Sequence, residues 1–378
     1  MRATSPFLRD AASAASGASI RDGASLTLET LDLHCGGEPL RWIRSGHPAI
    51  PDLPILERRR WVLEHADHVR RVAMYEPRGH RDMYGAIVLP PHRPDADVAV
   101  LFMHNEGYST MCGHGTIALA AALVEQGLVT ASAPETVIRF ETPAGLVTAH
   151  VATHIDATTG AATVDGVRFT NVPSYLAASD LRVVPDGIAL AGRAAAEGAL
   201  SVDLGFGGAY YGIVDAADLG LRVVPAETEA LTRAGAAITA VLRRDHVPAH
   251  PTDGDLGFVY GTIIVDEDPA SSPDGATPDA HIRNVTIFAE AEVDRSPCGS
   301  GTSALLAQRY ANGRLAAGEV LRNASLTGAV FEGRVEADTT LGPHAAVVTS
   351  VAGMGYRTGQ ATLVVDPRDP LGGGFLLR

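Results

Sequence analysis

A cysteine followed directly by a glycine occurs at two places in this chain, and each pair begins a run of small and apolar residues. The first pair is Cys112–Gly113, with a run that continues to Val124, and the second is Cys298–Gly299, with a run that continues to Ala307. Such runs predict buried helices, and glycine allows a ligand to approach the backbone closely. Each cysteine is therefore expected at a helix N-terminus, where free N–H groups favour a thiolate and can also hold a carboxylate. A buried structural cysteine is the alternative, since free cysteine packs as a small hydrophobe.

The repetition of this motif constrains the fold more than any other feature. Two such sites predict two similar half-domains that face each other across a cleft, with one thiol approaching from each side. One thiolate can remove a proton from a carbon while a thiol on the opposite face returns one. The product then has inverted stereochemistry, and no metal or organic cofactor is needed.

Composition limits the classes of protein that the chain can belong to. Its 378 residues predict two domains, and its net charge of −14 argues against nucleic acid or an anionic membrane as a partner. Cys35, Cys112 and Cys298 are the only cysteines, which gives no disulfide framework and no zinc-ligand spacing. We expect a cytoplasmic protein without a membrane span, and residues 1–26 are interpreted as a disordered tail rather than a signal peptide.

Short apolar and alternating segments dominate the chain, and they favour strands over long helices. Helices are predicted at 53–71 and 227–242, besides the two that follow the cysteines. A loop is predicted at 271–276. Strands are predicted at 26–33, 86–89, 98–103, 136–140, 146–151, 256–265, 284–288, 329–335, 345–351 and 360–365, and a strand or hairpin at 202–214. This order does not alternate strand and long helix as a doubly wound sheet would. Many strands with one central helix in each half is the better description.

Four motifs together resemble the proline racemase family, which includes 4-hydroxyproline epimerases and trans-3-hydroxy-L-proline dehydratases. The chain is more distantly similar to diaminopimelate epimerase. The motifs are Asp32–Pro39, Met111–His114, Phe206–Gly208 and Asp294–Gly299, and the similarity covers about residues 27–366.

The resemblance implies an α/β (α+β) fold with two similar lobes. Each lobe is a curved, mostly antiparallel sheet or barrel around a central helix, and the active site lies in the cleft between the lobes. Residues 27–165 with 355–378 would form the first lobe, which carries Cys112. Residues 166–354 would form the second lobe, which carries Cys298. We also expect an imino-acid substrate and a homodimer.

The subgroup signals within the family conflict. Residues 76–85 and 103–109 are similar to the dehydratase branch, in which the second cysteine position is typically threonine. Cys298 instead gives the cysteine pair of the racemases and epimerases. Cys35 also departs from the family, which usually has threonine there, and its role is open.

The resemblance and the local sequence assign roles around the two cysteines. Cys112 and Cys298 are the predicted acid/base pair, and the N–H groups of Gly113, His114, Gly299 and Ser300 are expected to hold the substrate carboxylate. Asp294 would contact the substrate's ring nitrogen, although an aspartate that caps the following turn is the alternative. His114 would contact the substrate or polarise Cys112, and a hydrogen-bonded core histidine is its alternative.

Three functions remain open from the sequence. The first is a cofactor-independent racemase or epimerase that inverts Cα of proline or a hydroxyproline with two thiols. The second is a trans-3-hydroxy-L-proline dehydratase that uses Cys112 as the base. The third, a non-catalytic imino-acid binding protein, has no need of two thiols. The sequence does not identify which proline derivative is bound.

Overall fold

The computed structural model describes residues 25–268 and 279–377, which divide into two compact units. The first unit holds residues up to 111, residues 115–167 and the residues from 354 onward. The second holds residues 168–353 together with the short segment Cys112–His114. The predicted tail at 1–26 lies outside the described residues except for its last two positions, and the loop at 271–276 lies wholly outside them.

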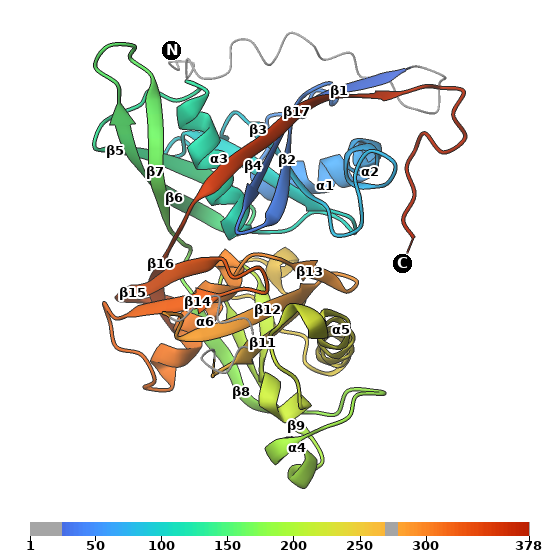
Figure 1. The fold of residues 1–378 in the computed structure, drawn as a ribbon, viewed down its shortest axis with the longest axis vertical. Coiled ribbons are helices and arrows are strands. Elements are labelled where there is room, and N and C mark those ends of the chain that lie inside the picture. The colour runs from blue at the N-terminus through green and yellow to red at the C-terminus, as the bar shows by residue number, and fades with distance from the viewer. Residues whose placement is uncertain (1–24, 269–278, 378) are drawn as a thin grey trace. The chain divides into compact units, whose positions relative to one another are not determined.

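The first unit is a mixed sheet built from both ends of the chain. Its strands are β1 (Leu26–Cys35), β2 (Glu38–Ser45), β3 (Tyr84–Leu89), β4 (Val98–His104), β5 (Glu135–Thr142), β6 (Gly145–Ile155) and β17 (Gly355–Val365). β17 pairs with β1 along its length, so the last strand of the chain completes the sheet that the first one begins (Figure 1). β1 and β2, β3 and β4, and β5 and β6 are antiparallel pairs, whereas β2–β3 and β4–β5 are parallel. The strand β7 (Ala162–Thr170) crosses the boundary between the units.

Helix α3 (Gly113–Glu125) is the buried helix of the first unit, as the apolar run predicted. β17 passes directly against it, because a Cβ atom built on Gly355 would lie 2.5 Å from the Cα atom of Ala118. Two further helices, α1 (Ile55–His65) and α2 (Asp67–Met74), pack a separate apolar cluster that includes Val62 and Val69 against β3 and β4. The segment predicted to be helical at 53–71 is therefore helical, but it is divided between two helices. The chain leaves helical geometry at Ala66 (φ −134°), and Asp67, paired with Arg70, starts a new helix with an acid at its positive end.

The second unit is a closed ring of strands around helix α6 (Gly299–Ala311). The strands are β8 (Tyr175–Val183), β9 (Leu200–Phe206), β10 (Tyr210–Asp215), β11 (Val259–Asp266), β12 (Ile282–Phe288), β13 (Glu292–Asp294), β14 (Val320–Ala324), β15 (Val330–Leu341) and β16 (His344–Gly353). A bridge between Ser174 and Val347 brings β16 beside β8 and closes the ring. β10–β11 and β12–β14 are parallel pairs, and the other neighbours are antiparallel.

Small residues allow α6 to lie inside this ring. A Cβ atom on Gly207 would come within 2.2 Å of the carbonyl oxygen of Ser300, so the strand end can approach the helix only without a side chain. The amphipathic helix α5 (Thr228–Asp245) covers β11 and β12 from outside (Figure 1), and the shorter α4 is Gly192–Glu197. Curved, largely antiparallel sheets, each with a buried helix, match the predicted fold class.

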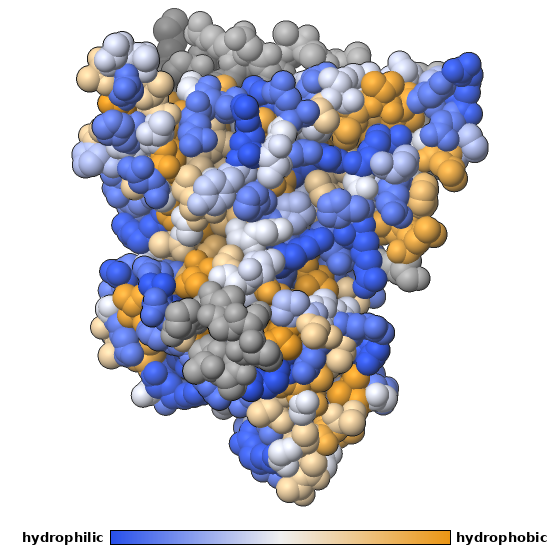
Figure 2. Space-filling model, viewed as in Figure 1, coloured by the Kyte–Doolittle hydropathy of each residue, from blue (hydrophilic) through white to orange (hydrophobic). Residues whose placement is uncertain are grey.

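The surface of the molecule mixes polar and apolar residues on the face drawn in Figure 2. The large exposed apolar side chains are spread over several parts of the chain, among them Leu63 on α1, Val137 on β5, and Tyr356 and Val364 on β17. No helix within residues 25–268 and 279–377 is long and apolar enough to cross a membrane. The homodimer stays a prediction.

Candidate functional site

Cys298 occupies the residue directly before α6, as the Cys-Gly motif predicted. Its backbone has φ +61° and ψ 103°, a region that favours glycine and is strained for a residue with a side chain. This conformation folds the side chain back over the first turn of the helix, where the N–H group of Gly301 donates to Sγ at 3.3 Å. The thiol is thus held by an N–H group at the positive end of a helix.

Two hydroxyl groups lie beside the same sulfur. Ser300 Oγ is 3.8 Å and the Tyr211 hydroxyl oxygen is 4.0 Å from Cys298 Sγ, and these two oxygens are 2.8 Å apart. Burial, and after it the charge of Asp294, raise the pKa of Cys298 to about 12, while the hydrogen bonds from Thr286, Gly301 and Ser300 act in the opposite direction. At neutral pH the resting side chain is a protonated thiol, which is the form that can give a proton.

Asp294 ends β13 and holds the turn that leads to Cys298. Its Oδ1 atom accepts hydrogen bonds from the N–H group (2.8 Å) and the hydroxyl group (2.7 Å) of Ser296. Ser296 Oγ in turn accepts from the N–H group of Cys298 at 3.1 Å. The capping contact considered as the alternative from sequence is therefore present. Burial also raises the pKa of Asp294 to about 6, against the lowering effect of the Ser296 hydrogen bonds, so the carboxyl group is suited to pairing with a cation.

Cys112 lies directly before α3 and contacts His114. Its Sγ atom is 3.3 Å from Nδ1 and 3.7 Å from Nε2 of the imidazole, and both side chains are buried. This contact agrees with the expectation that His114 polarises Cys112. It also provides the hydrogen bond that a core histidine would need.

The two Cys-Gly motifs meet within the second unit, to which Cys112–His114 belongs by its contacts. A Cβ atom on Gly113 would lie 2.4 Å from the Cα atom of Gly299, and one on Gly299 would lie 2.6 Å from the Cα atom of Gly113. Phe169 packs beside both glycines. The segments that carry the predicted acid/base pair and carboxylate-binding N–H groups are therefore neighbours, and glycine is needed at both positions for backbone to meet backbone.

Two residues near Cys298 were not singled out from the sequence. Ser296 stands inside the quoted motif, but its part in fixing the Cys298 backbone depends on the turn geometry. Tyr211 reaches α6 from β10, and its neighbour Tyr210 points to the opposite face of the strand, where it contacts Tyr175. Nothing local distinguishes two adjacent tyrosines, so the sequence carried no signal for Tyr211.

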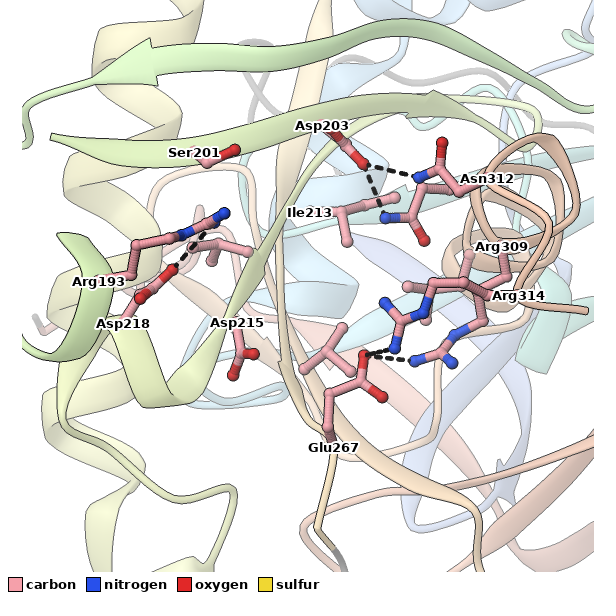
Figure 3. A pocket seen from close by; sticks show the side chains of 14 residues that line it. Arg193, Ser201, Asp203, Ile213, Asp215, Asp218, Glu267, Arg309, Asn312 and Arg314 are labelled. Atoms are coloured by element: carbon pink, nitrogen blue, oxygen red, sulfur yellow. Dashed lines mark hydrogen bonds and ion pairs between the residues drawn. The ribbon is translucent and has the colours of Figure 1, made fainter. Parts of the chain in front are cut away.

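The far end of α6 borders a polar cavity of about 250 Å³ (Figure 3). Glu267 binds both Arg309 (2.6 Å) and Arg314 (3.0 Å), and Asp203 accepts hydrogen bonds from Gln308 and Asn312. The charged groups of this cavity thus largely pair with each other. Its lining does not include the cysteines, and within residues 25–268 and 279–377 no His/Cys/Asp/Glu group could hold a metal ion.

Comparison with known proteins identifies the family. The sequence profile described as proline racemase matches residues 30–376. The chain belongs to the proline racemase family. The relatives in this family are enzymes, and nothing supports the third function, a non-catalytic binding protein.

Relatives within the family carry two different activities. The chain is 42% identical to a trans-L-3-hydroxyproline dehydratase of Xenopus tropicalis, over 93% of this chain and 95% of that protein. It is equally 42% identical to a 3-hydroxyproline 2-epimerase of Burkholderia multivorans, over 94% of this chain and 99% of that protein. Among solved structures, a hydroxyproline epimerase from Agrobacterium vitis with bound trans-4-hydroxy-L-proline has a TM-score of 0.80 and 30% identity, and the match covers 93% of this chain and 96% of that one. The family and the predicted fold class are confirmed. The relatives do not decide between epimerisation and dehydration.

Proposed function

We propose that this enzyme inverts the configuration at Cα of a hydroxyproline, or of proline, with Cys112 and Cys298 on opposite faces of the substrate. The observation that carries the proposal is the meeting of the two Cys-Gly motifs at Gly113 and Gly299, with a thiol on the residue before each glycine. Two thiols are what a two-base inversion requires, and one thiol would suffice for dehydration. The names of the relatives favour 3-hydroxyproline as the first substrate to test.

The reaction consists of two proton transfers. The Cys112 thiolate takes the Cα proton, and the electron pair of the C–H bond moves toward the carboxylate. N–H groups of Gly113, His114, Gly299 and Ser300 hold the carboxylate and stabilise the charge that develops on it. The Cys298 thiol then gives its proton to the opposite face of Cα and becomes a thiolate. In the reverse direction the two cysteines exchange roles.

Asp294 couples substrate binding to the acidity of Cys298. The negative charge of Asp294 is one of the causes that raise the pKa of Cys298, after burial. The ammonium group of a bound imino acid would neutralise that charge, since opposite charges at close range stabilise each other. A bound substrate thereby lowers the pKa of Cys298, so the thiol gives up its proton more readily.

Exchange with solvent tests the inversion. The enzyme is incubated in D₂O with trans-3-hydroxy-L-proline, trans-4-hydroxy-L-proline and L-proline, and the products are followed by NMR. We expect the inverted isomer of at least one substrate, with deuterium at Cα from the first turnover. An unsaturated product from 3-hydroxyproline, with no inverted isomer of any substrate, would contradict the proposal.

A trans-3-hydroxy-L-proline dehydratase is the second candidate, and the dehydratases among the relatives favour it. In that reaction Cys112 takes the Cα proton, the electron pair of the C–H bond forms a Cα–C3 double bond, and the C3–O bond breaks. The hydroxyl group leaves as water with a proton from a thiol, either that of Cys298 or the one just formed at Cys112. Cys298→Thr separates the two candidates because threonine has no thiol. An epimerase should lose most of its turnover in this variant and in Cys298→Ser, since a hydroxyl group is a poor base near neutral pH. A dehydratase should keep substantial activity as Cys298→Thr, and Cys112→Ser should be inactive in both cases.

A further inference from the structure

Tyr211 is the buried group near Cys298 to which neither the family motifs nor the proposed reaction gives a role. Its side chain is fully buried, and its hydroxyl oxygen lies 2.8 Å from Ser300 Oγ and 4.0 Å from Cys298 Sγ. Burying a hydroxyl group is unfavourable unless it is hydrogen-bonded. The position therefore requires a partner: Ser300 is the near one, and the Tyr211 oxygen also accepts a longer hydrogen bond from the Cys298 thiol.

The arrangement forms a short chain of donors that ends at the sulfur. When the Tyr211 O–H group donates to Ser300 Oγ, the Ser300 O–H group is free to donate to Cys298 Sγ. Chains of this kind strengthen each bond in a low-dielectric interior. Gly301 supplies a further donor through its N–H group, so a thiolate at position 298 would be met by backbone and hydroxyl donors together.

We propose that Tyr211 is a positioning residue for Cys298: its hydroxyl group orients Ser300 so that an O–H donor faces the sulfur when the sulfur is negatively charged. The inference rests on the proposed role of Cys298 as one of the two bases. It assigns to β10 a part in the chemistry of the cysteine that directly precedes α6.

Other titratable groups surround Cys298 and Tyr211. Asp294, on the preceding turn, acts on Cys298 directly by its charge. Arg295 acts on Asp294, and Tyr260 on β11 packs against the ring of Tyr211. Asp294 opposes a thiolate by its charge, and burial opposes it more strongly. The hydroxyl donors act against both effects, so removal of one of them has a predictable direction: the thiolate becomes harder to form.

Alkylation of Cys298 measures this effect without any substrate. In a background with Cys35→Ser and Cys112→Ser, Cys298 is the single thiol, and its rate of reaction with iodoacetamide between pH 7 and 9.5 follows the thiolate fraction. Tyr211→Phe removes the hydroxyl group and keeps the ring. We expect the rate at each pH to fall by about three- to tenfold, equivalent to an upward pKa shift of about half to one unit.

Tyr210→Phe is the matched control. It removes a hydroxyl group from the neighbouring buried tyrosine of the same strand, which pairs with Tyr175 and not with Ser300. Its alkylation rate should stay within twofold of the parent. In a Ser300→Ala background the effect of Tyr211→Phe should also disappear, because Tyr211 acts through Ser300.

Activity provides a second readout in the enzyme with all its cysteines. Tyr211→Phe should lower kcat with little change in KM, and the limb of the kcat pH profile that belongs to Cys298 should move to higher pH. A merely structural role would lower thermal stability without this movement. Alkylation rates within twofold of the parent, equal losses in Tyr210→Phe, or a parent Cys298 that does not react up to pH 9.5 would each overturn the proposal. None of these alkylation outcomes depends on which substrate the enzyme inverts, so they are distinct from a failure of the epimerase assignment.

Discussion

At the scale of single residues, Cys298 combines strain with burial. A side chain at φ +61° costs on the order of 1–3 kcal/mol, and the surrounding structure must impose it. Asp294 and Ser296 impose it here through the hydrogen bonds of the preceding turn. The sequence predicted the thiol and its place at a helix start. It could not predict the strained backbone or the Tyr211 contact, since both depend on residues distant in the chain or on turn geometry.

The raised pKa of Asp294 leads to a prediction about stability and pH. Its ordinary value is 3.8, and burial raises it to about 6 in the folded chain. Between these values the folded protein binds a proton that the unfolded chain has released, so stability falls as the pH rises from about 4 to about 6. In the parent, the free energy of unfolding should fall by on the order of 2–3 kcal/mol between pH 4 and pH 6, and Asp294→Asn should abolish this fall. Urea unfolding of both proteins at pH 4.5 and pH 7 measures it, and equal changes in the two proteins would contradict the prediction.

The close approach of Gly113 and Gly299 predicts the effect of adding a methyl group. Gly299→Ala places a Cβ atom 2.6 Å from the Cα atom of Gly113, which forces the two segments apart. We expect a loss of about 1–3 kcal/mol of stability and of most of the activity. Gly166→Ala is the control, because a Cβ atom there meets no heavy atom within 4 Å. Thermal melting and turnover distinguish the two variants, and similar results for both would show that the contact is unimportant.

At the scale of elements, both central helices were predictable and their surroundings were not. Runs of small and apolar residues after Cys112 and Cys298 indicate burial on all sides, which only a central helix satisfies. The break at Ala66 carried no glycine or proline to reveal it. The closing of β16 onto β8 also left no local signal, because it joins Ser174 to Val347 across most of the second unit.

The C-terminal end of α6 is fixed by Glu267, which leads to the next prediction. Burial alone would raise the pKa of Glu267, but Arg309 and Arg314 hold it below its ordinary value of 4.5. The stabilisation is therefore complete above about pH 4.5 and is lost as the pH falls through the lower, folded-state value.

Glu267→Gln should destabilise the protein by about 1–2 kcal/mol at pH 7, because the Arg309 side chain is buried and loses its charged partner. Glu332→Gln breaks a pair of the same length with Arg322 at a more exposed site, and should cost less than about 0.5 kcal/mol. Denaturant midpoints measure both. Equal losses would show that burial of the arginine does not matter.

At the scale of the whole molecule, the two units are assembled from the chain in different ways. The second unit is nearly continuous in sequence, whereas the first unit is assembled from three separate stretches. The resemblance to a known family predicted that the C-terminus returns to the first lobe. The pairing of β17 with β1 agrees with that prediction. Hydrophobic periodicity alone could not have indicated which strands pair.

Removal of β17 should therefore affect the first unit selectively. A chain that ends at Met354 leaves β1 with an unpaired edge on the β17 side and exposes α3 at Ala118. Hydrogen exchange followed by mass spectrometry should show lost protection in β1 and α3, with protection in β8–β16 largely kept. Loss of protection in both units alike would indicate that they unfold together.

The pairing of the first strand with the last also has a consequence for synthesis. A ribosome releases Leu26 early and Val365 near the end of translation, yet these two residues are paired in the finished sheet. The second unit can complete its ring of strands once Gly353 has emerged, while β1 still lacks its neighbour. During that interval the nascent chain carries a folded second unit and, in the first unit, an open strand edge, which is the form most in need of protection by a chaperone.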